Sequence, residues 1–176
     1  MADSPTGQGT KGSNREKSSL LIVEDDAALA AILEEYLSDA AYDVNVLYNG
    51  DSALKLLADE SFDLILSDVM LPGASGMAIL QKLGGNPEHT LVILMTGYSG
   101  IDDALSAVEE GAYDYISKPF RLPEVRVRLD NAVAYQRLLR KLMELNTDVP
   151  LPLKPYKKTS GETAMRVYRG LSGQRS

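Results

Sequence analysis

Residues 62–73 read FDLILSDVMLPG, an apolar run that ends at the carboxylate of Asp68. An apolar run without alternating polar residues is typical of a strand that is covered on both faces of a parallel sheet. A carboxylate at the mouth of such a strand costs free energy unless it meets a cation. We therefore expect the carboxylate of Asp68 to face a positive charge at the end of this strand.

Three other apolar runs also end in polar side chains. The runs and the residues that follow them are 20–23 with Glu24, Asp25 and Asp26, 91–95 with Thr96, and 113–117 with Lys118 and Pro119. In a parallel sheet the carboxyl ends of the strands share one edge, and ligands bind outside that edge. The acids, the hydroxyl and the amine are therefore predicted to form one site.

Amphipathic stretches separate the apolar runs and give five β-α units. We expect strands near 20–24, 43–48, 62–67, 90–95 and 113–117, and helices near 27–40, 53–57, 76–83, 101–110 and from about 122 onward. This alternation predicts an α/β fold with a doubly wound, five-stranded parallel sheet and helices on both faces. Asp26 suits the N-cap of the first helix, whose apolar face is predicted to hold Leu29, Ile32, Leu33, Tyr36 and Leu37.

The chain divides into four parts by composition. We expect a disordered N-terminal segment at 1–18, one folded domain at 19–135, an extension of the last helix at 136–146, and a proline-containing basic tail at 147–176, also disordered. Cysteine is absent, so disulfides and Cys-rich zinc sites are excluded. No secretory signal and no run of membrane-spanning length is present, which favours a soluble cytoplasmic protein without membrane contact.

The formal net charge of −7 is unevenly distributed. Residues 1–18 carry three basic and two acidic side chains, and residues 146–176 carry six basic and two acidic ones, which leaves −12 for the residues between them. An acidic body of this kind disfavours direct nucleic-acid binding.

Taken together, the ordered set of strand-end residues resembles the receiver domain of two-component response regulators. The set comprises Glu24-Asp25, Asp68, Thr96, Tyr115 and Lys118-Pro119, and residues 111–120, GAYDYISKPF, are especially similar to this family. The resemblance covers about residues 19–135. It implies the flavodoxin-like strand order 2-1-3-4-5 and a Lys118–Pro119 bond in the cis form.

The resemblance also implies a chemistry for the site. Asp68 would accept a phosphoryl group from the phosphohistidine of a histidine kinase or phosphotransfer protein. Three neighbouring carboxylates repel one another and need a divalent cation, and an oxygen-only ligand set suits Mg²⁺. By motif position the ligands would be Asp25 and Asp68 directly, Glu24 through water, and the backbone carbonyl of Met70.

The resemblance also implies roles for Lys118, Thr96 and Tyr115, and in this family the residues that carry the signal are Thr96 and Tyr115. Lys118 and Thr96 would contact phosphoryl oxygens, and Tyr115 would turn inward when the Thr96 hydroxyl moves to the phosphate. The surface that changes would be the last two strands with the helices near 101–110 and 122–135. The domain would promote its own phosphoryl transfer and dephosphorylation, and it would not be an enzyme that acts on a separate substrate.

We expect a stand-alone regulator without an effector domain, which acts through a downstream protein partner. The first alternative is the receiver part of a truncated transcriptional regulator whose DNA-binding or ATPase output is missing. The second is a magnesium-dependent phosphatase of the haloacid dehalogenase type. Those enzymes need an acid two residues after the nucleophile, where this chain has Met70.

The predicted last helix, 122–146, is longer than a receiver needs. Its apolar residues recur at three- and four-residue steps and comprise Val125, Leu129, Ala132, Val133, Leu139, Leu142 and Met143. The first half of this stripe is expected to pack on the sheet. The second half predicts a homodimer or partner contact through Leu138 to Leu145, and the alternative is a frayed helix end shielded by Arg137, Arg140 and Lys141.

Overall fold

The computed structural model describes residues 17–40, 42–83, 90–97 and 111–145. Their elements are β1 (Ser18–Val23), α1 (Ala27–Asp39), β2 (Tyr42–Leu47), α2 (Gly50–Asp59), β3 (Leu64–Asp68), α3 (Gly76–Leu83), β4 (Leu91–Thr96), β5 (Asp114–Ser117) and α5 (Leu122–Glu144). The five strands are all parallel, in the order β2-β1-β3-β4-β5. This confirms the predicted α/β fold and strand order.

Some expectations concern parts of the chain that lie outside the described residues. These are the helix near 101–110, residues 1–16 of the N-terminal segment, and the basic tail at 147–176. Ser18, the last residue of the predicted N-terminal segment, is the first residue of β1.

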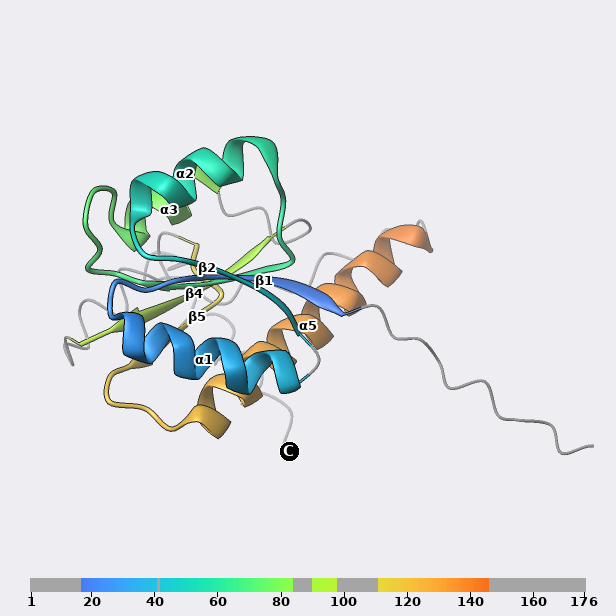
Figure 1. The fold of residues 1–176 in the computed structure, drawn as a ribbon. Coiled ribbons are helices and arrows are strands. Elements are labelled where there is room, and N and C mark those ends of the chain that lie inside the picture. Colours follow the sequence, from blue (N-terminus) through green and yellow to red (C-terminus); the bar gives the residue numbers. More distant parts are fainter. Residues whose placement is uncertain (1–16, 41, 84–89, 98–110, 146–176) are drawn as a thin grey trace, which may run out of the picture.

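Helices cover both faces of the sheet, α1 and α5 on one face and α2 and α3 on the other (Figure 1). Each inner strand contributes alternate side chains to the two layers, because successive residues of a strand point to opposite faces. Leu20 and Ile22 of β1 pack in the layer with α1 and α5, whereas Leu21 and Val23 pack in the layer with α2 and α3. The unbroken apolar runs of the sequence therefore reflect burial on both sides.

The register of the sheet aligns the polar strand ends. Val23 pairs with Ser67, Asp68 pairs with Met95, and Thr96 pairs with Ser117. The residues that follow β1 and β5 therefore lie at the same edge as the last residues of β3 and β4, as the sequence predicts.

The start of α1 confirms the predicted cap, because Asp26 Oδ1 accepts hydrogen bonds from the Ala28 and Leu29 N–H groups at 2.9 and 3.1 Å. The prediction of the apolar face of α1 was wrong for one residue. Ile32 is 50% exposed, whereas Leu33 and Leu37 are buried. The helical period places Ile32 at the margin of the apolar arc, and the sheet covers the other margin.

Helix α5 runs along the sheet and continues past its edge (Figure 1). Pro123 lies in its first turn, where its missing N–H is harmless. Packing reaches further along the helix than predicted, because Leu139 is only 1% exposed. The expected contact surface from 138 to 145 therefore loses Leu139 and retains Leu138, Met143 and Leu145, which are exposed. None of the helices in the described ranges combines the length and hydropathy needed to cross a membrane.

Candidate functional site

Three carboxylates converge at the carboxyl edge of the sheet. Glu24 and Asp25 follow β1, Asp68 ends the neighbouring β3, and one ligand oxygen from each lies within 4.8 Å of the other two. Glu24 is fully buried and Asp68 is 7% exposed, whereas Asp25 faces solvent. Two buried carboxylates side by side require a nearby positive charge.

Lys118 supplies a positive charge to both buried carboxylates. Its Nζ donates a hydrogen bond to Glu24 Oε2 at 2.7 Å and another to Asp68 Oδ2. Burial alone would lower the pKa of the Lys118 ammonium, but the hydrogen bonds to Asp68 and Glu24 outweigh burial and raise this pKa. The ammonium is therefore held in its charged form, and the cation expected opposite Asp68 is present in the chain itself.

The backbone around Lys118 fixes the approach of its side chain. The Lys118–Pro119 bond is cis, as the family resemblance implied. The Lys118 N–H donates a hydrogen bond to the Thr96 carbonyl oxygen at 2.7 Å. The ends of β4 and β5 are thereby joined beside the carboxylates.

One ammonium does not neutralise three carboxylates. Burial raises the pKa of Glu24, Lys118 opposes this rise, and the charge of Asp68 adds to it. A cluster of oxygen ligands with an excess of negative charge is suited to a hard divalent cation. Glu24, Asp25 and Asp68 could therefore hold a metal ion.

Both oxygens of Asp68 are oriented by the protein. Oδ2 accepts the hydrogen bond from Lys118, and Oδ1 accepts one from the Met70 N–H at 2.9 Å. Met70 is the second residue of the β3–α3 loop, residues 69–75, and its side chain points to solvent with 68% exposure. The position of this loop therefore affects both the carboxylate and the backbone of Met70.

The start of α2 holds the β3–α3 loop in place, a contact that sequence reasoning missed. The Gly50 N–H donates to the Pro72 carbonyl at 3.1 Å, and Asp51 Oδ1 accepts from the Ala74 N–H at 3.2 Å. A Cβ atom at Gly50 would overlap the Ala74 carbonyl oxygen, so only glycine fits there. The sequence signal for this contact is the pair Asn49-Gly50, in which Asn49 caps α2 and Gly50 begins it.

The two predicted switch residues lie on the strands farther from Glu24. Thr96 ends β4 next to Ser117 in the sheet register and is 7% exposed. Tyr115 is half-buried on β5, paired with Leu94. The structure thus brings together Glu24, Asp25, Asp68 and Lys118, and it places Thr96 at the same edge, with Tyr115 on the neighbouring edge strand.

A family model described as the response regulator receiver domain matches residues 20–130 of this chain. Among curated proteins, the chain is 38% identical over 118 residues to the uncharacterized transcriptional regulatory protein YkoG of Bacillus subtilis. That match covers 67% of this chain and 52% of YkoG. The chain is also 36% identical over 150 residues to the response regulator protein FleR of Pseudomonas aeruginosa, covering 85% of this chain and 31% of FleR.

Solved structures show the same architecture. The signal receiver domain of the putative Luxo repressor protein from Vibrio parahaemolyticus superposes with a TM-score of 0.67 at 27% sequence identity. The superposition covers 73% of this chain and 98% of that domain. Matches therefore span nearly the whole of an isolated domain of this type, but about half or less of the YkoG and FleR chains.

Proposed function

The chain belongs to the family of response regulator receiver domains, and on that premise we propose that Asp68 accepts a phosphoryl group in a Mg²⁺-dependent reaction. An oxygen of the Asp68 carboxylate attacks phosphorus, the bond from phosphorus to the donor histidine nitrogen breaks, and an acyl phosphate forms. The observation that carries this proposal is the convergence of the Glu24, Asp25 and Asp68 carboxylates, with the Lys118 ammonium hydrogen-bonded to Glu24 and Asp68.

We assign the Mg²⁺ ligands by their positions in the motif of this family. Asp25 and Asp68 would bind the ion directly, Glu24 would act through water, and the Met70 carbonyl would be a further ligand; the three carboxylates lie close enough together to share one ion. A bound ion would offset the excess negative charge and the charge of the incoming phosphoryl group. The exposed position of Asp25 suits a direct ligand, since it leaves access from solvent.

Lys118 has a second role in this proposal. Its ammonium already contacts Asp68 Oδ2, so it lies within reach of an oxygen of a phosphoryl group attached to that carboxylate. Positioning and charge neutralisation are what phosphoryl transfer requires of a protein. The Thr96 hydroxyl would bind another phosphoryl oxygen from the same edge of the sheet.

The test is phosphorylation by a small acyl-phosphate donor, followed by intact-mass spectrometry. We expect one phosphoryl group on the wild-type chain with Mg²⁺, none after chelation with EDTA, and none on Asp68→Asn. Asp26→Asn is the matched control, because asparagine also caps helices and Asp26 lies beside the site. Equal labelling of Asp68→Asn and the wild type contradicts the proposal.

The signal is proposed to leave the site through Thr96 and Tyr115. Phosphorylation draws the Thr96 hydroxyl toward Asp68, and Tyr115 on β5 moves into the space that the hydroxyl leaves. Thr96→Ala should still be phosphorylated but should lose any change in partner binding. A Thr96→Ala chain whose partner binding responds normally to phosphorylation removes Thr96 from the switch.

The proposed donor is a histidine kinase or phosphotransfer protein, and the proposed receiver of the signal is a downstream protein. We keep 19–135 as the receiver domain and 136–146 as the extension of α5.

One observation favours a second form of this function, in which α5 leads into an output part of a longer regulator. The match to FleR covers 150 residues, more than the receiver domain alone. Reading the gene beyond the codon for Ser176 tests that form directly.

A further inference from the structure

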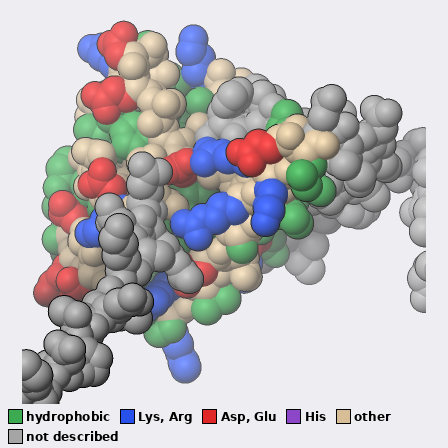
Figure 2. All heavy atoms as spheres, turned by 90° about the vertical axis from the view of Figure 1, so that its right-hand side faces the viewer, with side chains coloured by type: hydrophobic (Ala, Val, Ile, Leu, Met, Phe, Trp, Pro, Cys, Tyr) green, Lys and Arg blue, Asp and Glu red, His purple; other side chains and the backbone are tan. Residues whose placement is uncertain are grey.

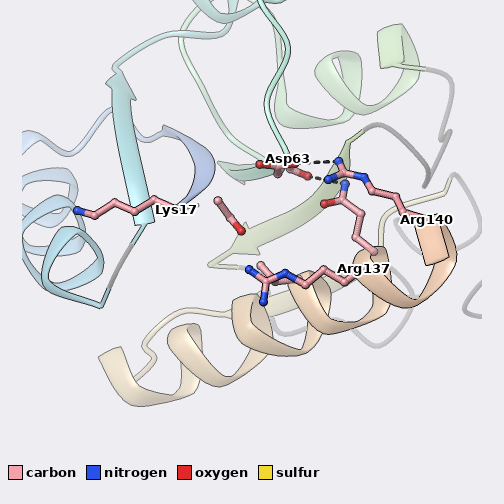
Figure 3. Close-up of a pocket in the computed structure, with 7 residues that line it drawn as sticks. Lys17, Asp63, Arg137 and Arg140 are labelled. Atoms are coloured by element: carbon pink, nitrogen blue, oxygen red, sulfur yellow. Dashed lines mark hydrogen bonds and ion pairs between the residues drawn. The ribbon is translucent and has the colours of Figure 1, made fainter. Parts of the chain in front are cut away.

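A pocket lies at the opposite edge of the sheet from Asp68, where the strands begin. It opens between α5 and the starts of β1 and β3, with a volume of about 410 Å³ (Figure 3). Its walls are mostly polar, and its lining residues are Lys17, Ser18, Asp63, Val133, Gln136, Arg137 and Arg140. Val133 is the single apolar side chain of this lining, so the pocket suits a polar occupant.

The negative charge of the pocket is already bound within the protein. Asp63 Oδ1 accepts from Arg140 at 2.8 Å, and Asp63 Oδ2 accepts from the N–H and the hydroxyl of Ser19 at 2.9 and 3.0 Å. The buried Gln136 amide donates to the Asp63 carbonyl at 3.2 Å. These contacts join α5 to the start of β3 and leave Asp63 neutralised.

Arg140 is paired with Asp63, whereas Arg137 is not paired with a carboxylate of the pocket. Figure 3 shows Arg140 turned to Asp63, while the Arg137 guanidinium extends into the space between α5 and the strands. Among the residues that the structure describes, Arg137 makes no hydrogen bond or ion pair. Lys17 lines the pocket by its stem, and its ammonium points away in the same view. The pocket therefore has a cation, Arg137, whose counter-charge has to come from outside this set.

We propose that this pocket binds a small polar anion that presents a phosphate or carboxylate group to Arg137 and to the remaining N–H donors of Arg140. The planar guanidinium fork matches these oxyanions through paired hydrogen bonds. The volume lies within the range of small-molecule sites. The basic segment 146–176 is an unsuitable occupant because of its positive charge.

Figure 2 views the molecule from this end and shows Lys and Arg side chains gathered in the middle of the face, with Asp and Glu side chains beside them. A bound anion would hold α5 to the strand starts through Arg137 and Arg140, in addition to the Asp63 contact. This function is separate from the phosphorylation of Asp68, which occurs at the far ends of the same strands.

The experiment titrates the full chain with three probes. Binding is monitored by nuclear magnetic resonance, through the chemical shifts of the backbone amides. The probes are inorganic phosphate, a nucleoside monophosphate and malonate, in EDTA and without Mg²⁺. We expect saturable shifts at Ser18, Asp63 and Gln136 with at least one probe. A phosphate or a dicarboxylate response identifies which oxyanion the site prefers, and either one supports the site.

Two variants test whether the anion binds at Arg137. Arg137→Gln should weaken the binding about tenfold or more, because a hydrogen-bonded charge is lost. Arg121→Gln, an exposed arginine at the other end of α5, is the matched control and should bind as the wild type does. The site should persist in Asp68→Asn, so a failure of the phosphorylation proposal leaves this one standing.

Three results would overturn the proposal. The first is an Arg137→Gln chain that binds as tightly as Arg121→Gln. The second is a set of shifts confined to Asp25, Asp68 and Lys118. The third is an acidic peptide that binds this face while all three small anions fail, since that outcome makes the face a protein-binding surface.

Discussion

Lys118 Nζ lies 2.7 Å from Glu24 Oε2, and the Glu24 side chain is only 1% exposed to solvent. The same ammonium contacts Asp68. Lys118 therefore neutralises the interior carboxylate of the site as well as the residue proposed to be phosphorylated. Removing one partner of a buried ion pair leaves the other charge without compensation, which destabilises a protein strongly.

The first prediction concerns Lys118→Ala. We expect the free energy of unfolding without metal to fall by about 1–3 kcal/mol, because Glu24 and Asp68 lose their counter-charge. Mg²⁺ should stabilise this variant more than the wild type, since the ion replaces the missing charge. Chemical denaturation with EDTA and with Mg²⁺ measures both effects, and Lys55→Ala on the exposed face of α2 is the control. An equal Mg²⁺ stabilisation of variant and wild type refutes this account.

Gly50 gives the second prediction, because it begins α2 directly against the β3–α3 loop. Alanine usually favours a helix over glycine, but the added Cβ at position 50 has to displace the backbone of Ala74. We expect Gly50→Ala to lose about 1–3 kcal/mol of stability. It should also need more Mg²⁺ for phosphorylation, since the loop carries Met70.

The control for this prediction is Gly97→Ala, whose added Cβ meets no atom within 4 Å. Urea denaturation should show a loss for Gly50→Ala and little change for Gly97→Ala. A Gly50→Ala chain as stable as the wild type, with an unchanged Mg²⁺ requirement, shows that the loop does not depend on this contact.

The contrast between these sites indicates what the sequence can predict. The edge that gathers Glu24, Asp68 and Lys118 follows from local patterns, because each residue ends an apolar run and parallel strands align their ends. The approach of Gly50 to Ala74 leaves no such pattern, since it depends on how a helix start meets a loop 24 residues later. Short-range periodicity reports which face is apolar, but not which distant backbone lies against it.

The same limit applies at the opposite edge of the sheet. Asp63 and Arg140 are separated by 77 positions, and each reads as an ordinary charged residue in its own segment. Their contact depends on the length of α5 and on its angle across the sheet. The prediction that Ile32 lies on the buried face of α1 was wrong for a related reason. The helical period alone does not tell which margin of an apolar face is covered by the rest of the protein.

The third prediction is a pH dependence that arises from Asp63. Burial alone would raise the pKa of this carboxyl, but the hydrogen bonds from Arg140 and Ser19 outweigh it, and the pKa is lowered. A lowered folded-state pKa gives stability that is present above the unfolded pKa of about 3.9 and is lost as the pH falls through the folded value. The other charged groups that line this pocket are Lys17, Arg137 and Arg140, and all three are basic.

Asp63→Asn should therefore cost about 1 kcal/mol near pH 7, and this cost should shrink as the pH falls below about 4. Denaturation of wild type and variant from pH 3 to 7 gives the difference directly. Asp43→Asn, an exposed aspartate on β2, is the control for the loss of one negative charge. A cost for Asp63→Asn that does not change with pH would contradict the assigned ion pair.

The last prediction concerns the outer face of α5. Val127, Leu138 and Leu145 are 57%, 52% and 63% exposed, and their spacing places them on one face together with Ala134. The steps of four and seven residues are those of a coiled-coil seam, and Asn131 occupies a seam position where a polar residue fixes the register. This face lies opposite the buried stripe of Val125, Leu129, Ala132 and Leu139. We therefore expect a second copy of the chain to pack on it.

The test uses Leu138→Glu together with Leu145→Glu, because Leu139 is buried and its replacement would disturb the fold. A leucine buried at an interface contributes about 1.5–3 kcal/mol, so the pair should weaken a dimer by far more than tenfold. Sedimentation equilibrium measures this in both phosphorylation states of Asp68. Met143 is exposed as well, but it lies on the other side of the helix end from Leu138 and Leu145 and is therefore not part of this narrower surface, so Met143→Glu should leave the dimer intact. A wild-type chain that stays monomeric at high concentration in both states would show that this face does not join two copies.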